Sequence, residues 1–275
     1  MWQLDKMGSM VKKGRGRLIL PGVSSQVWDR IQSENAIRED EQAAQARNNQ
    51  DARWVLDRVP PEGRLLDLGC GSGRLLEMHL GRHADHAKGW ALGVDLSWPA
   101  LQSARQRLLS AGLVPRLVQA NLVDLQCLKG AQLDAAACLF STLGMIRGYG
   151  NRLRFLSGVF EALRPGGLII LHAHARWWHL TTAQGRAWLL RDVWARWLGK
   201  ENAGEYRSHN CPPQVPSLGH FTKGELIHLV KMAGFQPVEC SRLEADQAQG
   251  KKTDKSIAWY ARLLPAHGWL LAARK

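Results

Sequence analysis

Short apolar runs alternate with amphipathic helical patterns along the middle of the chain, between residues 63 and 175. Strands alternating with helices are typical of βαβ units, which build a parallel sheet. Two more strands are predicted near the end of the chain, after a further helix, so the pattern predicts an α/β fold. The expected strands are residues 64–68, 91–95, 116–119, 134–140, 168–173, 235–240 and 268–273.

Three helices between these strands have recognisable ends. Ser97 can cap the first helix, and Gly112 ends it. The second ends near Leu163, before a turn predicted at residues 164–167, and Thr222 can cap the third. The apolar positions expected to be buried are Leu101, Ala104, Leu108 and Leu109 in the first helix, and Leu226, Leu229, Val230 and Ala233 in the third.

The two ends of the chain differ from this middle. Residues 1–17 carry five basic residues and one acid, which predicts a basic arm. Residues 25–59 contain few helix breakers and predict one or two polar helices. We therefore expect an N-terminal region of arm and helices at residues 1–61 and one domain at residues 62–275, with a polar loop at residues 246–256.

Composition narrows the class of protein. A chain of 275 residues with 45% hydrophobic and 22% charged residues can bury a core, which excludes wholesale disorder. No apolar run approaches the roughly 18 to 20 residues that span a bilayer, and the first residues lack the apolar core of a signal peptide. We expect a cytoplasmic protein without stable membrane insertion. The five cysteines are widely scattered and form no C-x-x-C pair, so we expect free thiols.

The formal net charge of +13 is the one unusual bulk property. It predicts attraction to polyanions such as RNA or to anionic membrane surfaces. Charge alone does not make either of them the substrate.

The strongest motif is a glycine-rich turn after the first predicted strand. Gly69, Gly71 and Gly73 follow Asp67 and precede a helix that begins near Arg74. Glycines at this edge of a parallel sheet let a nucleotide-like ligand approach the backbone. A dinucleotide fingerprint would need a small residue in place of Arg74, and Asp67 suits an ammonium group better than a pyrophosphate.

A second acid stands at the corresponding place of the next strand. Asp95 ends the strand predicted at residues 91–95, where its carboxylate can accept two hydrogen bonds from a ribose diol. The alternative is that Asp95 caps the following helix, although Ser97 already fits that role. Together, Asp67, the glycines and Asp95 would contact three parts of one ligand: an amino-acid end, the place where its sugar approaches the backbone, and the ribose hydroxyls.

With these residues the sequence resembles the class I S-adenosylmethionine-dependent methyltransferase family, closely over residues 63–175 and more loosely over residues 219–275. The resemblance implies a three-layer αβα Rossmann-like fold, with a seven-stranded, mostly parallel sheet whose last strand is antiparallel. It also implies S-adenosylmethionine as the cofactor. The residues that would bind it are Asp67, Gly69, Cys70, Gly71 and Gly73 for the methionine and sugar, Asp95 for the ribose, Leu96 for the adenine face, and Asn121 with Leu122 for the adenine edge. Asn121 departs from the Asp that many members have at its position.

Two histidines are candidates for acid–base chemistry. Methyl transfer to a hydroxyl needs removal of one proton, for which a single His can suffice. His172 and His174 end the strand predicted at residues 168–173, and strand alternation points both to one face. They can equally be hydrogen-bonded histidines beneath a lid. We predict no metal, because their spacing comes without a clear third ligand.

A helical lid insertion is predicted at residues 176–218, ending in a Pro-rich connector at residues 211–216. It holds five of the twelve tryptophans, and Leu189, Leu190, Val193, Trp194, Trp197 and Leu198 form an apolar face. Three interpretations stay open: tryptophans that pack the lid onto the sheet, a cover over a lipophilic or aromatic acceptor, and a surface that stacks nucleic-acid bases or touches a membrane.

The predicted function is methyl transfer to an unidentified small or lipophilic acceptor. The alternative is an RNA-directed enzyme, because the domain also resembles the methyltransferases that act on the wobble uridine of tRNA. A third hypothesis is a non-catalytic binding module that has kept the fold. The oligomeric state does not follow from the sequence.

Overall fold

The computed structural model describes residues 50–82, 90–199, 203–207, 217–243 and 266–275, and in the N-terminal arm only the backbone of four short strands. These four form two antiparallel pairs. The remainder of the predicted arm and polar helices, the connector at 211–216 and the loop at 246–256 lie outside the described residues. The four strands are β1 (Trp2–Leu4), β2 (Met10–Lys12), β3 (Ile19–Leu20) and β4 (Val23–Ser24).

Seven strands form the central sheet in the order β12-β13-β9-β8-β5-β6-β7. Only β13 runs antiparallel to its neighbours, β9 and β12, while the other pairs are parallel. This arrangement confirms the predicted fold class. The strands are β5 (Leu65–Leu68), β6 (Ala91–Asp95), β7 (Leu117–Gln119), β8 (Leu133–Cys138), β9 (Leu163–His174), β12 (Gln236–Leu243) and β13 (Gly268–Arg274).

The predicted turn at residues 164–167 is wrong, because β9 includes these residues and begins directly after a helix. They form an irregular part of the strand, where the register with β8 shifts and Gly166 has φ +74°. The N–H of Gly166 donates to the Lys275 carbonyl at 3.1 Å, and the N–H of Lys275 donates to the Gly167 carbonyl at 2.9 Å. The end of the chain therefore supplies hydrogen bonds that keep this segment in the sheet.

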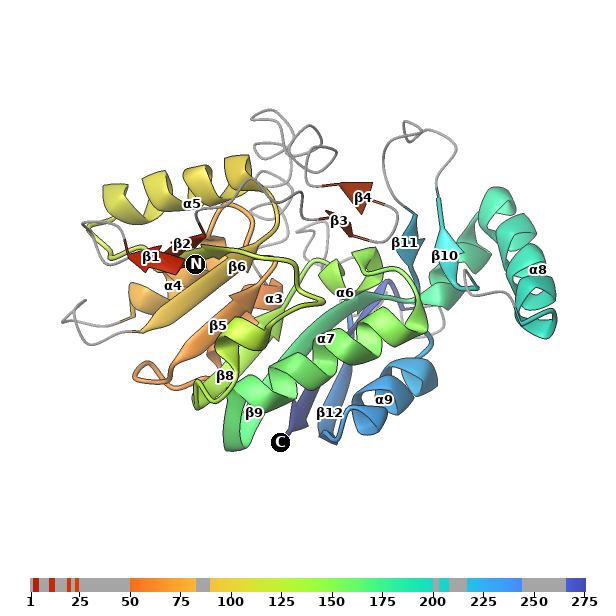
Figure 1. The fold of residues 1–275 in the computed structure, drawn as a ribbon. Coiled ribbons are helices and arrows are strands. Elements are labelled where there is room, and N and C mark those ends of the chain that lie inside the picture. The colour runs from red at the N-terminus through yellow and green to blue at the C-terminus, as the bar shows by residue number, and fades with distance from the viewer. Residues whose placement is uncertain are drawn as a thin grey trace, which may run out of the picture.

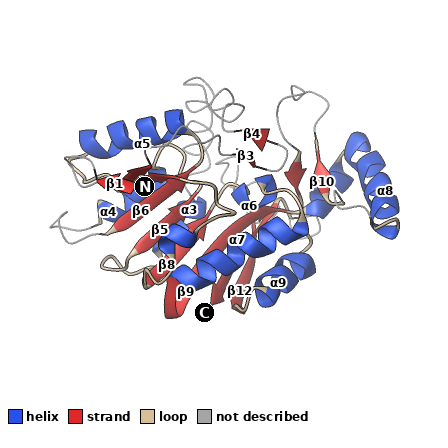
Figure 2. Cartoon of the chain, in the orientation of Figure 1, coloured by secondary structure: helices blue, strands red, loops and turns tan. Residues whose placement is uncertain are grey.

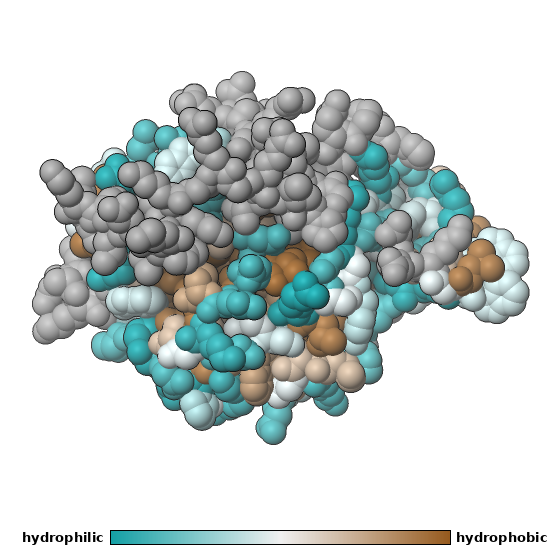
Figure 3. All heavy atoms as spheres, viewed as in Figure 1, coloured by the Kyte–Doolittle hydropathy of each residue, from teal (hydrophilic) through white to brown (hydrophobic). Residues whose placement is uncertain are grey.

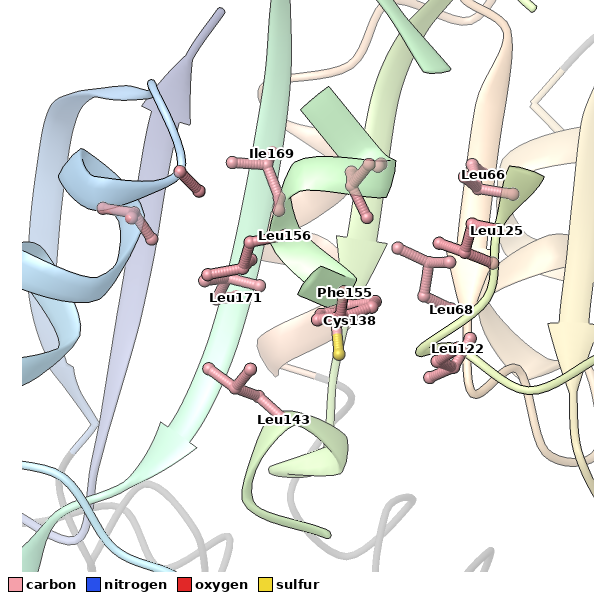
Figure 4. Packing of buried hydrophobic residues seen from close by; sticks show 14 of the residues in the cluster. Leu66, Leu68, Leu122, Leu125, Cys138, Leu143, Phe155, Leu156, Ile169 and Leu171 are labelled. Atoms are coloured by element: carbon pink, nitrogen blue, oxygen red, sulfur yellow. The ribbon is translucent and has the colours of Figure 1, made fainter. Parts of the chain in front are cut away.

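Helices cover both faces of the sheet and make three layers (Figure 1 and Figure 2). The core on one face lies between the strands and two helices, α7 (Tyr149–Ala162) and α9 (Lys223–Met232). Part of this core is shown in Figure 4, where Phe155 and Leu156 of α7 pack on Leu171 of β9 and Cys138 of β8. The other face is covered by α3 (Gln50–Leu56), α4 (Arg74–Leu80) and α5 (Trp98–Ser110).

The predicted helix ends are largely as expected. The Ser97 hydroxyl accepts a hydrogen bond from the Ala100 N–H at the start of α5, and Gly112 has φ +70° after its end. Thr222 forms a capping box with Glu225 at the start of α9. The prediction for Leu109 is wrong, because it is 44% exposed at the margin of the α5 stripe. The four apolar positions predicted for the third helix are all buried.

The region predicted as a lid contains η2 (Arg176–Thr181), α8 (Ala183–Trp197) and a short hairpin of β10 (Glu205–Tyr206) with β11 (Leu218–Gly219). Helix α8 extends beyond the end of the sheet (Figure 1). Trp188 is half-buried, whereas Trp177, Trp194 and Trp197 are exposed, so the interpretation that tryptophans pack this region onto the sheet is wrong for those three. Among the described residues, none of the helices is long and apolar enough to cross a membrane.

Candidate active site

The glycine turn follows β5 and has three glycines in the left-handed region, with φ +76° at Gly69, +52° at Gly71 and +79° at Gly73. A Cβ at Gly69 would lie 2.6 Å from Thr142 Cγ2, and one at Gly73 would lie 3.0 Å from Ala104 Cβ. A Cβ at Gly71 would meet no atom within 4 Å. Gly69 and Gly73 are therefore required by packing, whereas the backbone at Gly71 borders open space that a ligand can enter. This space fits the predicted cofactor.

Asp95 at the end of β6 is bonded to the turn. Its Oδ2 accepts the N–H of Gly71 at 2.9 Å, and its Oδ1 accepts the N–H of Ser97 at 2.9 Å. The second bond is the helix-start contact of the alternative interpretation of this residue. An ionised carboxylate has about four acceptor sites, so these two bonds are compatible with the predicted contact to a ribose.

Asp67 is the buried charge of the site, with a residue exposure of 3%. Its pKa is raised to about 7, mainly because burial removes water from the carboxylate, and the nearby carboxylates Asp95 and Asp51 contribute in the same direction. Arg74 acts in the opposite direction, although its own guanidinium lies 3.2 Å from Asp51 Oδ2. A ligand with a positive charge next to Asp67 would favour the ionised carboxylate.

The other residues expected at the cofactor are differently placed. The thiol of Cys70 points into the core, where burial raises its pKa, so Cys70 offers a ligand only its backbone. The Leu96 carbonyl accepts the Gln119 side-chain amide at 3.0 Å. The side-chain oxygen of Asn121 accepts the Val123 N–H at 3.0 Å and so stabilises its own turn, and Leu122 is buried. Asn121 retains one lone pair for an adenine amino group.

Phe140 and Ser141 directly after β8 are both in the left-handed region, with φ +51° and +59°. Non-glycine residues rarely adopt this conformation, and it costs about 1 to 3 kcal/mol for each residue. The Phe140 ring lies 4.8 Å from Arg74 Cζ and 6.4 Å from the ring of His172. The Ser141 hydroxyl accepts the N–H of His174 at 3.1 Å. The strained pair thus joins the glycine turn to the predicted histidines.

His172 and His174 lie on one face of β9, as predicted, with ring centroids 5.6 Å apart. His172 is 2% exposed, whereas His174 is only half-buried. Three further histidines extend the group: His220 is stacked on His174 at 5.5 Å, His267 lies edge-on to it at 5.3 Å, and His179 is 4.5 Å from His220. We call these five residues the histidine cluster.

Two histidines of the cluster, His220 and His179, have lowered pKa values. The pKa of His220 is lowered to about 3, mainly by burial, and the nearby His179 and Arg176 contribute in the same direction. The Nδ1 of His220 is 2.9 Å from the Leu218 carbonyl, so the neutral ring donates its Nδ1 proton there. Burial also lowers the pKa of His179. Within the part of the chain that the structure describes, no three His, Cys, Asp or Glu side chains are arranged to hold a metal ion.

Residues 65–167, which include the glycine turn, Asp95 and β8, match a family model described as a methyltransferase domain. This part of the chain belongs to the class I S-adenosylmethionine-dependent methyltransferase family. The cofactor of this domain is therefore S-adenosylmethionine.

Two curated relatives are named for substrates of different classes, a nucleotide sugar and a tRNA nucleotide. The chain is 31% identical over 143 residues, or 52% of its length, to a dTDP-3-amino-3,4,6-trideoxy-alpha-D-glucopyranose N,N-dimethyltransferase of Streptomyces venezuelae. It is 27% identical over 215 residues, or 75% of its length, to a tRNA U34 carboxymethyltransferase of Hydrogenovibrio crunogenus. The matches span 54% and 56% of these two relatives, so the chain spans about half the length of each.

The same fold occurs in the 1,6-didemethyltoxoflavin-N1-methyltransferase of Burkholderia thailandensis, whose crystal structure contains 1,6-didemethyltoxoflavin and S-adenosylhomocysteine. The TM-score is 0.57 at 18% identity, with 91% of this protein and 87% of that chain covered. At this identity the likeness concerns the fold alone.

Proposed function

We propose that the protein transfers a methyl group from S-adenosylmethionine to a small acceptor with an apolar or aromatic part, which binds against the histidine cluster. One observation carries the proposal: the Phe140 ring contacts both Arg74, which begins the helix after the glycine turn, and His172. A cofactor at Gly71 and an acceptor at the cluster would therefore be neighbours. The unit that does this is residues 62–275, with the insertion at residues 176–218.

The cofactor would be held by the residues at the ends of β5 and β6. Asp67 would pair with its ammonium group, Asp95 would accept the ribose hydroxyls, and the open backbone at Gly71 would let it approach. When bound, the cofactor supplies a methyl group on a positively charged sulfur, which is already activated for displacement. The protein therefore has to align the acceptor and, for a hydroxyl, to remove its proton.

His174 is the residue that we assign to proton removal. It is half-buried, whereas His172 is almost fully buried and His220 is too weak a base, with a pKa of about 3. The Ser141 hydroxyl holds the backbone of His174, and the stacked ring of His220 holds its side chain. His172 then acts as a positioning residue between His174 and Phe140.

The rings around the cluster favour an apolar or flat acceptor. Trp178 lies 5.1 Å from His267, and Tyr206 lies 4.0 Å from His179. Trp188 lies 4.8 Å from His179 and donates its indole N–H to the Glu205 carbonyl at 3.1 Å. Such rings offer stacking and apolar contact with few charges.

Mass spectrometry of metabolite extracts incubated with the protein and methyl-labelled S-adenosylmethionine tests the proposal. We expect a labelled small molecule to appear with the wild type, and its rate of formation to fall by a factor of about 10² to 10⁴ in His174→Ala for a hydroxyl acceptor. His228→Ala changes an exposed histidine of α9 outside the cluster and is the matched control. Label in no small molecule would contradict the proposal.

An RNA acceptor is the second candidate, because the match to the tRNA-modifying relative covers 75% of the chain and the net charge is +13. Binding of tRNA should then weaken steeply between about 50 and 200 mM salt as counterions are released. Label in the RNA fraction of the same extracts would favour this candidate. Absence of binding at about 50 mM salt would exclude it.

A further inference from the structure

Helix α8 presents an apolar stripe to solvent. Leu190, Val193, Trp194 and Trp197 follow the i, i+3, i+4, i+7 spacing of a stripe that normally faces a core. Their exposed fractions are 75%, 60%, 62% and 76%. We call these four residues the outer stripe. The rings of Trp194 and Trp197 lie 5.2 Å apart, and apolar atoms reach the surface at the α8 end of the molecule (Figure 3).

The opposite face of α8 is fixed to the body by four charged side chains, of which Asp192 and Arg176 are buried. Asp192 is 5% exposed and lies 3.5 Å from Arg176 and 3.0 Å from Arg196. Glu225 of α9 lies 2.8 Å from the same Arg176 and 2.5 Å from the same Arg196. Asp192 also accepts the N–H of Gly204. Turning the outer stripe inward would bury tryptophans only by separating these ions, so its outward direction is built into the fold.

Within α8 (Ala183–Trp197), the exposed charges around the outer stripe have one sign. Arg186 and Arg191 are exposed on α8, and the only acid of the helix is the buried Asp192. A solvent-facing helix surface of aliphatic residues, tryptophans and arginines has the composition of helices that lie in the interface of an anionic membrane.

Two other occupants fit this surface less well. A second copy would carry the same charge of +13 and would place Arg186 and Arg191 close to their own equivalents. An RNA strand could stack on Trp194 and Trp197, but the aliphatic side chains Leu190 and Val193 offer bases no flat partner.

We propose that the outer stripe docks the protein on the surface of an anionic lipid bilayer. Trp194 and Trp197 would enter the headgroup region with the two aliphatic residues, while Arg186 and Arg191 contact lipid phosphates. The contact is peripheral and reversible, and it does not depend on the identity of the methyl acceptor.

Co-sedimentation of the full-length chain with lipid vesicles tests the proposal. Vesicles of phosphatidylcholine are compared with vesicles of equal parts phosphatidylcholine and phosphatidylglycerol. We expect binding to the anionic vesicles, and a partition coefficient at least about tenfold lower in Trp194→Ser/Trp197→Ser. Arg186→Gln/Arg191→Gln should lower binding to anionic vesicles further than binding to neutral ones. Met232→Ser/Val238→Ser changes two exposed apolar residues of α9 and β12 and is the matched control, which should bind as the wild type.

Calorimetric binding of S-adenosylhomocysteine by each variant shows that it is folded. The proposal is overturned if the wild type does not bind anionic vesicles at low salt, or if the tryptophan variant binds them equally well. Loss of tRNA binding in the tryptophan variant without vesicle binding would assign the stripe to nucleic acid. A dimer in analytical ultracentrifugation that the tryptophan variant abolishes, again without vesicle binding, would assign it to a second copy.

Discussion

The backbone N–H of Gly71 donates a 2.9 Å hydrogen bond to the carboxylate of Asp95. The end of β6 therefore fixes the one glycine of the turn that borders open space. The same carboxylate accepts the N–H of Ser97 at the start of α5. One side chain thus connects a strand, a turn and a helix around the place where we put the ribose.

Replacing Asp95 by Ala should weaken cofactor binding by roughly 1.5 to 3 kcal/mol, because charge-assisted hydrogen bonds are lost. Isothermal calorimetry with S-adenosylhomocysteine measures the change. Asp124→Ala removes an exposed carboxylate of the loop after β7 and should leave the affinity unchanged. Equal affinity of Asp95→Ala and the wild type would mean that the ribose lies elsewhere.

The two glycines Gly69 and Gly71 should respond differently to Ala. Gly69→Ala would bring a methyl group 2.6 Å from Thr142 Cγ2, so we expect a lower thermal midpoint, partly restored in Gly69→Ala/Thr142→Ala. Gly71→Ala meets no neighbour and should cost only about 1 kcal/mol of backbone strain, while cofactor affinity falls more. Thermal unfolding with and without S-adenosylhomocysteine separates the two effects. A Gly71→Ala protein that binds normally would contradict the open-site interpretation.

Asp67 should make both stability and binding depend on pH. Its pKa is about 7 in the folded protein against an ordinary value of 3.8, so the ligand-free folded state holds the proton more tightly than the unfolded state. The free energy of unfolding should therefore fall as the pH rises from about 4 to about 7. Asp67→Asn should flatten this part of the curve, which urea unfolding at several pH values measures.

The same carboxyl should couple cofactor binding to proton release. A cationic ligand favours ionised Asp67, so binding near pH 7 should release a proton and weaken as the pH falls. Calorimetry in two buffers of different ionisation enthalpy detects the proton. If the Asp67→Asn variant still releases a proton on binding the cofactor, the proton comes from another group.

His220 should destabilise the protein in acid. Its pKa is about 3 in the folded state against 6.5 for free histidine, so its contribution to stability is present above about pH 6.5 and is lost as the pH falls. The loss at about pH 5 should be about 2 kcal/mol. His220→Phe should show a shallower decline between about pH 7.5 and pH 5, whereas the exposed control His228→Phe should follow the wild type. Identical slopes for wild type and His220→Phe would show that the ring is not held neutral.

Asp192→Ala should lower the free energy of unfolding by about 3 to 5 kcal/mol, because it leaves the buried guanidinium of Arg176 without one of its two carboxylate partners. The matched control is Glu161→Ala, which breaks an ion pair of 3.6 Å to Lys129 whose side chains are 52% and 71% exposed. That exposed pair should contribute less than about 1 kcal/mol. Similar urea midpoints for the two variants would contradict the structural role of Asp192.

Much of the fold could be predicted because its signals are local. Short apolar runs between helical patterns indicated all seven strands of the sheet, and the capping residues Ser97 and Thr222 indicated the starts of two helices. The glycine turn and Asp95 were predictable because parallel strands bring their carboxyl ends to one edge. His172 and His174 share a face for the same periodic reason.

The rest of the site depends on contacts between distant segments. His220 and His267 reach His174 from parts of the chain far along the sequence, and no local pattern marks them. Nothing in a Phe-Ser pair signals the left-handed backbone of Phe140 and Ser141. The apolar face of α8 could be predicted, but a helical pattern does not say whether that face meets the body or solvent, and here the ion cluster around Asp192 decides.

Strand β13 lies between β9 and β12 and is hydrogen-bonded to both, although it is the last of the seven strands in sequence. During synthesis, therefore, β12 emerges from the ribosome before the strand that joins it to the sheet. Until then, the edges of β9 and β12 that pair with β13 have no partner strand. The half of the sheet that carries the histidine cluster can form only after residues 268–274 have left the exit tunnel. This half of the sheet should accordingly be the last part of the sheet to fold, and chaperones that shield strand edges should act on the chain before it does.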